Sequence, residues 1–141
     1  MRSHKRFGLL ACVALLVAQA CSPGFFIIAT DAWMQAPVGY TQAADGSLQI
    51  TDYWAIVLNP WILPQYTHTM SGAVTTGAFV MAGLGAYYLL SGEHTSSARL
   101  FVRTGVVVGL LASLCQLWPT GDLEGVQVTQ LQPTKLAAME G

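Results

Sequence analysis

Three stretches of the chain are long and apolar enough to cross a lipid bilayer, and they limit its possible folds more than any other feature. They cover residues 7–30, 68–90 and 100–118. A helix needs roughly 20 mainly apolar residues to span the hydrocarbon core. Charged residues make up only 9% of the chain, whereas soluble domains carry about 25%, so there is too little charge to cover a water-facing surface. We therefore predict an all-α integral membrane bundle of three transmembrane helices with periplasmic loop segments.

Small residues within the spans are typical of helices that pack closely in lipid. The second span contains four glycines, at positions 72, 77, 83 and 85. Because glycine has no side chain, two helix backbones can approach each other closely where it lies between them. We expect these glycines to lie at helix contacts.

The cations indicate how the spans are oriented. They gather before the first span and around the turn between the second and third: Arg2, Lys5, Arg6, Arg99 and Arg103. Segments 31–67 and 119–141 carry mostly acidic residues, and Lys135 is their single cation. The positive-inside rule puts the N-terminus and the 91–103 turn in the cytoplasm, and His68 and the C-terminal tail on the outer face of the membrane. A net charge of −1 without a basic patch gives no reason to expect nucleic acid as a partner.

The N-terminus has a second interpretation. A basic start, an apolar core and Ala18-Gln19-Ala20 before Cys21 are also typical of a secretory signal, and Cys21 could mimic a lipoprotein cleavage site. The apolar run resumes at Phe25, however, and a signal core is shorter than a full span. We favour an uncleaved first helix and keep a membrane-tethered lipoprotein as the alternative.

His68 is the main candidate for chemistry. It opens the second span at the outer membrane boundary, where a neutral imidazole nitrogen can ligate haem iron. Ionisable groups inside membranes are functional candidates by default. On position alone, an interfacial histidine with a wet edge explains it equally well. His4 and His94 lie in polar segments and are predicted to be solvated, and the three cysteines lack metal-ligand spacing.

Two further segments lie outside the spans. Residues 33–40 are typical of an interfacial aromatic belt and turn. Residues 52–63 predict a short surface helix that ends before Pro60. In the polar tail, Lys135 and Glu140 are five positions apart, and by composition alone they would be solvated surface charges.

Four stretches together resemble subunit I of the cytochrome bd-type quinol oxidases. They are Trp33-Met34-Gln35 with Pro37-Val38-Gly39; Leu58-Asn59-Pro60; His68-Thr69 with Ser71-Gly72 and Thr76-Gly77; and Gly121-Asp122 with Gln132 and Lys135-Leu136-Ala137-Ala138-Met139-Glu140. Their order and spacing match the family along the whole chain. The stretch Gly24-Phe25-Phe26-Ile27-Ile28-Ala29 looks most like the cyanide-insensitive branch.

The resemblance implies a respiratory oxidase that oxidises quinol and reduces dioxygen to water. The family's histidine that matches His68 is an axial ligand of the low-spin haem b. The lysine and glutamate that match Lys135 and Glu140 begin the quinol-binding loop, here residues 119–141. Electrons then pass to a high-spin haem b and haem d. The implied partners are subunit II, the remaining helices of subunit I and the lipid membrane.

The chain departs from the family in two ways. Asp31 stands where the family usually has asparagine, which adds a carboxylate at the membrane edge. The chain also resembles only the middle of a longer helix bundle, and it lacks the methionine that is the second ligand of the low-spin haem. We therefore expect a partial subunit, from a truncated reading frame or gene fragment, that is not active alone. The alternative is a non-catalytic membrane protein that only packs against partner helices.

Overall fold

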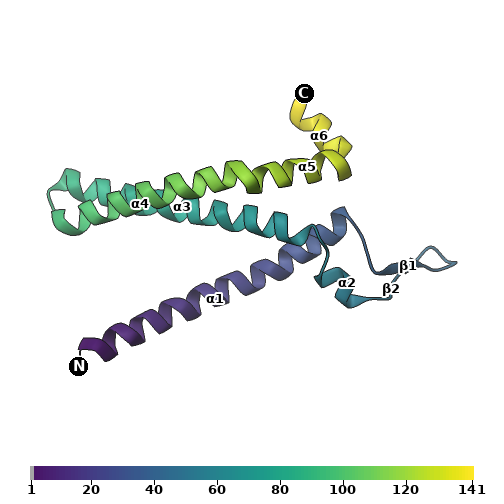
Figure 1. The fold of residues 1–141 in the computed structure, drawn as a ribbon, viewed down its shortest axis with the longest axis horizontal. Helices are drawn as coiled ribbons and strands as arrows, with labels where there is room; N and C mark the ends of the chain where they lie inside the picture. The colour runs from purple at the N-terminus through teal and green to yellow at the C-terminus, as the bar shows by residue number, and fades with distance from the viewer. Residues whose placement is uncertain (1) are drawn as a thin grey trace. The chain divides into compact units, whose positions relative to one another are not determined.

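The chain folds into two compact units, one ending at Ile62 and the other spanning Leu63–Gly141. The computed structural model describes the backbone of residues 2–141 and their side chains except at positions 2–10, 12 and 20. Both units are mainly helical in the described range, and the first also holds a short β-hairpin (Figure 1). The predicted all-α class is confirmed.

In the first unit, α1 (Arg2–Gln35) is one continuous helix that contains the first predicted span. Pro23 lies inside it, so one backbone N–H is missing there without ending the helix. Long apolar side chains such as Leu15 and Ile27 are exposed, whereas Ala32 is buried. An apolar helix with so much uncovered surface is suited to lipid.

The connection that follows α1 contains a hairpin absent from the sequence-based prediction. β1 (Tyr40–Gln42) pairs antiparallel with β2 (Leu48–Ile50), and Gly46 in the turn has a φ of 85°, which favours glycine. Both strands have three residues, all exposed, so they carry too little apolar alternation to be detected in the sequence. α2 (Tyr53–Val57) ends before Pro60, as predicted.

In the second unit, α3 (Ile62–Ser91) and α4 (Thr95–Cys115) run side by side in opposite directions (Figure 1). A Cβ atom at position 105 would lie 2.6 Å from the carbonyl oxygen of Ala78, and one at position 85 would lie 2.8 Å from that of Ala98. No side chain fits at these separations, so glycine is what allows the two backbones to approach.

The four glycines of the second span divide into two groups. Gly85 lies against α4, and a Cβ at Gly72 would come within 3.0 Å of the Gln116 side-chain nitrogen. Gly77 and Gly83 have no neighbour within 4 Å among the described residues. The expectation of close contact is correct for two of the four.

The tail is helical. A wide π-helical turn, η1 (Gln116–Gly121), links α4 to α5 (Asp122–Leu131), and α6 (Pro133–Glu140) follows. Gln132 separates the last two helices with φ −132° and ψ 62°, in keeping with the restriction that the following proline imposes. The predicted loop segment is therefore two short helices.

Within the part of the chain that the structure describes, three helical segments are long and apolar enough to cross a membrane. They are Val13–Gln35, Tyr53–Ser91 and Thr95–Leu131. Only 6%, 11% and 11% of their most apolar windows are buried within the chain. Most of this apolar surface therefore requires lipid or neighbouring helices as its cover.

Candidate functional site

His68 lies within α3 and not at its start. The helix begins six residues before it, at Ile62, so the span predicted from residue 68 begins too late. Pro64 falls in the first turn, where a missing N–H leaves no intrahelical bond unmade. His68 is half-buried on the second turn of the helix.

The imidazole side chains of His68 and His94 have different surroundings. His94 precedes α4 in the left-handed conformation, is exposed, and stacks edge-on against Tyr88 with ring centroids 5.9 Å apart. The prediction of a solvent-facing His94 is thus confirmed. His68 lines a cavity, and His94 is not among the residues that line it.

The junction between α4 and α5 comes close to His68. Trp118, which precedes Pro119, has extended backbone angles of −150° and 130°, and it interrupts the regular helix. The hydroxyl oxygen of Thr120 lies 3.4 Å from Nδ1 of His68. A Cβ at Gly121 would lie 3.6 Å from Cε1 of the same ring. Gly121 therefore lies in van der Waals range of the imidazole edge.

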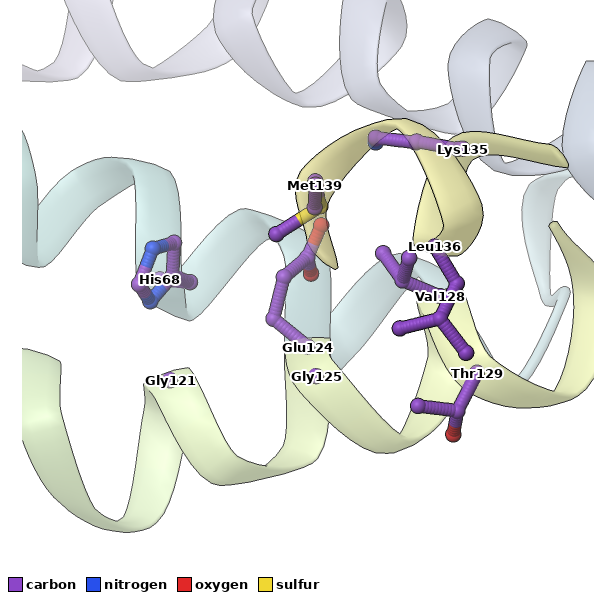
Figure 2. A pocket seen from close by; sticks show the side chains of 9 residues that line it. All are labelled: His68, Gly121, Glu124, Gly125, Val128, Thr129, Lys135, Leu136 and Met139. Carbon is purple, nitrogen blue, oxygen red and sulfur yellow. The ribbon is translucent and has the colours of Figure 1, made fainter. Parts of the chain in front are cut away.

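A cavity of about 400 Å³ lies between α3, α5 and α6, all within the second unit. Figure 2 shows His68 on one side and the α6 side chains on the other, with Glu124 extending from α5 toward α6. Its lining residues are His68, Gly121, Glu124, Gly125, Val128, Thr129, Lys135, Leu136 and Met139. The walls are largely apolar with a few polar groups, which is the usual character of a small-molecule site.

The structure brings together two of the three predicted site residues. Lys135, on the first turn of α6, lines the same cavity as His68. Glu140 is the last residue of α6, is exposed, and is not among the described residues that line the cavity. Five positions correspond to about 140° around a helix, so the two side chains leave α6 in different directions.

Glu124 and Met139 also line the cavity, although the sequence analysis assigned neither of them a role. One carboxylate oxygen of Glu124 is buried and has no hydrogen-bond partner in the described part of the chain. When a short turn joins two antiparallel helices, residues that are equally many positions before and after the turn lie opposite each other. That register could have indicated which tail residues lie near His68.

The stretches of the first unit that carry the resemblance have local structural roles. Trp33 donates through Nε1 to the carbonyl of Val38 at 2.8 Å. Asn59, which is 3% exposed, donates through Nδ2 to the carbonyl of Ala36 at 2.9 Å. The carbonyl of Gly39 accepts from two backbone N–H groups, at 2.8 and 3.1 Å. These residues hold the connection between α1 and α2 in one shape.

Asp31 lies next to this connection. Its carboxylate accepts a hydrogen bond from Nε2 of Gln35 at 2.7 Å, one helical turn away. The carboxylate that departs from the family pattern is therefore matched by a donor within α1.

Comparison with known proteins decides the family. A family model described as cytochrome bd terminal oxidase subunit I matches residues 1–141. The chain belongs to this family. It is 31% identical over 130 residues to the cytochrome bd ubiquinol oxidase subunit 1 of Bacillus subtilis (strain 168), covering 92% of this chain and 27% of that protein. It is 35% identical over 117 residues to the cytochrome bd-II ubiquinol oxidase subunit 1 of Escherichia coli (strain K12), covering 82% of this chain and 23% of that protein.

The name of a third relative specifies a different quinol, menaquinol. The putative cytochrome bd menaquinol oxidase subunit I of Bacillus subtilis (strain 168) is 25% identical over 140 residues, covering 94% of this chain and 30% of that protein. The chain thus spans 23–30% of the length of these relatives. Its share of the cytochrome bd subunit I fold is the part with α1, the α3–α4 pair and the two tail helices.

A cytochrome family implies haem, and the residues around His68 fit one axial position. An imidazole with one nitrogen engaged by a hydroxyl keeps the other nitrogen available for iron. The ring of His68 also lines the cavity between α3, α5 and α6. No cluster of three or more His, Cys, Asp or Glu side chains able to hold a metal occurs among the described residues.

Proposed function

We propose that this chain forms part of a terminal respiratory oxidase that oxidises quinol and reduces dioxygen to water. In this proposal His68 is an axial ligand of the low-spin haem b, and Lys135 and Glu140 begin the quinol site. The high-spin haem b and haem d, subunit II and the remaining helices of subunit I complete the enzyme. The proposal concerns the whole enzyme, because the chain spans only 23–30% of the length of its relatives.

The observation that carries this proposal is the shared cavity. His68 and Lys135 come from α3 and α6, far apart in the sequence, and both line the same space. Electron transfer from a quinol to a haem requires the two to be close. A cavity with a candidate iron ligand on one side and a cation on the other offers that proximity.

Each residue has a distinct chemical role in the proposal. When bound, haem supplies an iron centre that accepts electrons one at a time. The Lys135 ammonium donates a charge-assisted hydrogen bond to a quinol oxygen and orients the ring. Val128, Leu136 and Met139 provide apolar contact for the ring and its tail. Glu140, exposed at the end of α6 and outside the cavity, accepts protons that have left the quinol site and passes them to water.

The proposed orientation puts this chemistry on the periplasmic side. With the basic N-terminus and the 91–103 turn in the cytoplasm, His68 and α6 are at the outer face of the bacterial inner membrane. Protons from quinol would then leave to the periplasm. A reporter fused after Glu93 should be cytoplasmic, and a periplasmic signal would contradict this orientation.

The test of the haem role replaces His68 in a full-length subunit I that carries this segment. His68→Ala should remove the low-spin haem b spectrum and leave the other haem signals. The matched control is His94→Ala, which removes a histidine that lies outside the cavity. If both variants keep the low-spin signal, His68 is not the ligand, and the non-catalytic packing alternative gains support.

The quinol role is tested in the same full-length context. Lys135→Ala should lower apparent quinol affinity by roughly 10-fold, the equivalent of one charged hydrogen bond, with the haem spectrum intact. Glu140→Gln should lower the turnover rate more than the affinity, because it removes the proton acceptor and keeps the shape. Equal loss of haem and activity in either variant would instead indicate a structural role.

A further inference from the structure

One carbonyl in the α4–α5 junction, that of Cys115, accepts a hydrogen bond from a side chain. In an α-helix the N–H of each residue bonds to the carbonyl four positions earlier, and Pro119 has no N–H to offer Cys115. The hydroxyl of Thr120 donates to this carbonyl, at 2.8 Å. The proton of the Thr120 hydroxyl is therefore committed to the backbone.

A second hydroxyl in the same place is committed in the same way. Ser71 donates to the carbonyl of His68 at 2.7 Å. The oxygens of Ser71 and Thr120 are 3.5 Å apart, a longer contact than either backbone bond. With both protons on backbone carbonyls, the Thr120 oxygen offers only lone pairs to its remaining neighbours.

One of those neighbours is Nδ1 of His68, at 3.4 Å. An oxygen that has already given its proton to a carbonyl can only accept, so this contact favours the tautomer with the ring proton on Nδ1. The other ring nitrogen, Nε2, then has a free lone pair. This tautomer is set by the hydroxyl geometry of the Trp118-Pro119-Thr120-Gly121 junction, far from His68 in the sequence.

We propose that Thr120 is a positioning residue for His68: its hydroxyl accepts a hydrogen bond from Nδ1–H and holds the ring with Nε2 free to bind iron. Histidine ligands generally use their second nitrogen in such a bond, which fixes ring orientation and raises ligand basicity. The inference rests on the proposed function only in assigning iron to Nε2. The tautomer itself is independent of any cofactor.

The first experiment measures the tautomer in the haem-free 141-residue chain. The chain is labelled with 15N-histidine, held in detergent micelles at about pH 8.5, roughly two units above the ordinary histidine pKa, and its ring nitrogens are recorded by NMR. His68→Gln identifies the His68 signals. Wild type should show Nδ1–H and unprotonated Nε2 at His68, and Thr120→Val should lose this preference.

Two variants control the measurement. Thr120→Ser keeps the hydroxyl and should retain the wild-type tautomer, which separates the hydrogen bond from any effect on folding. Thr76→Val removes an exposed α3 hydroxyl that donates only to the carbonyl of Gly72, and it should change nothing at His68. An Nε2–H tautomer in wild type, or an identical tautomer in Thr120→Val, would overturn the proposal.

The second experiment titrates the same chain with ferric haem b and follows the Soret band. His68→Ala should abolish saturable binding, Thr120→Val should weaken it roughly 10- to 100-fold, and Thr120→Ser should restore it. If His68→Ala has no effect on haem affinity, the assigned ligand is wrong and the proposed function fails with it. If His68→Ala abolishes binding but Thr120→Val binds like wild type, only the role of Thr120 is overturned.

Discussion

The connection between α1 and α2 and the contact between α3 and the α4–α5 junction hold their polar groups in different ways. In the connection, side chains bond to backbone carbonyls at 2.8 and 2.9 Å, through Trp33 and Asn59. At the α3 contact, the polar distances between helices are 3.4, 3.4 and 3.5 Å, and they involve His68, Ser71, Thr75 and their partners. The first region is fixed by its own short bonds, and the second is held by backbone packing.

The buried polar side chains of the two regions differ in the same way. Trp33, Gly39 and Asn59 are needed for the shape of the connection, and the chain itself satisfies their hydrogen bonds. In the second unit, Gln65 and Gln127 are 2% and 0% exposed, yet their amide atoms find no partner among the described residues. Polar groups of this second kind are more typical of a site than of a structural corner.

The largest effect is expected from a substitution that disrupts the packing of α3 on α4. It tests whether backbone packing holds the second region together. Gly105→Leu puts a side chain where a Cβ would already be 2.6 Å from the Ala78 carbonyl, so the helices must separate. We expect a loss of about 3 kcal/mol in the free energy of unfolding, measured by circular dichroism in mixed micelles. The control Gly83→Leu has open space within 4 Å and should be near neutral. Equal losses in the two variants would show that backbone contact does not hold this pair together.

The next test removes a bond from the connection. Asn59→Ala leaves the Ala36 carbonyl without the Nδ2 donor and the Trp61 N–H without the Oδ1 acceptor. Since the residue is buried, we expect a loss of about 2 kcal/mol in the free energy of unfolding. Haem affinity should be unchanged. Gln49→Ala, on an exposed strand, is the control and should cost nothing measurable. A loss of haem affinity in Asn59→Ala would instead show that the connection between α1 and α2 contributes to the haem site.

A smaller effect is expected from a hydroxyl between α3 and the junction. Thr75 donates to its own helix at 2.9 Å and contacts the Gln116 side-chain oxygen at 3.4 Å. Thr75→Val should lower the unfolding free energy by about 0.6 kcal/mol, the average for hydrogen bonds between membrane helices. Thr76→Val provides the matched control. If Thr75→Val is as costly as Asn59→Ala, the contrast between the two regions does not hold.

The smallest effect concerns the hairpin turn. Asp45 accepts from the backbone N–H and the hydroxyl of Ser47, at 2.9 and 2.6 Å, and these bonds lower its pKa below the ordinary 3.8. A lowered pKa means that the turn is stabilised above that value and loses this stabilisation as the pH falls through the folded-state pKa. The Ser47 amide signal, followed by NMR, should titrate with a midpoint below 3.8. Ser47→Ala should move the midpoint upward, and an unshifted midpoint in wild type would contradict the bond.

Much of the helical fold could be predicted because lipid allows few alternatives. A long apolar run must become a helix when no water can satisfy its backbone, so the three spans were visible in the sequence. The ends of the helices were less visible. α3 begins six residues before His68 because prolines are tolerated in a first turn, and the tail forms α5 and α6 although its polar composition suggested a loop. The hairpin was missed because its exposed strands carry no apolar pattern.

The candidate site was predictable by residue and not by arrangement. His68 and Lys135 were identified from the sequence and the resemblance, and charge placement assigned them to the same membrane face. Only the tertiary structure shows that both line one cavity while Glu140 leaves α6 in another direction. It also brings Thr120 within reach of His68, which depends on the close glycine packing of α3 on α4 and on the break at Pro119. Apolar length and charge are properties of neighbouring residues, so the sequence determines spans and sidedness by itself. Contacts between side chains that are far apart in the sequence depend on ångström-scale separations of helix backbones. These separations are decided only when the helices pack.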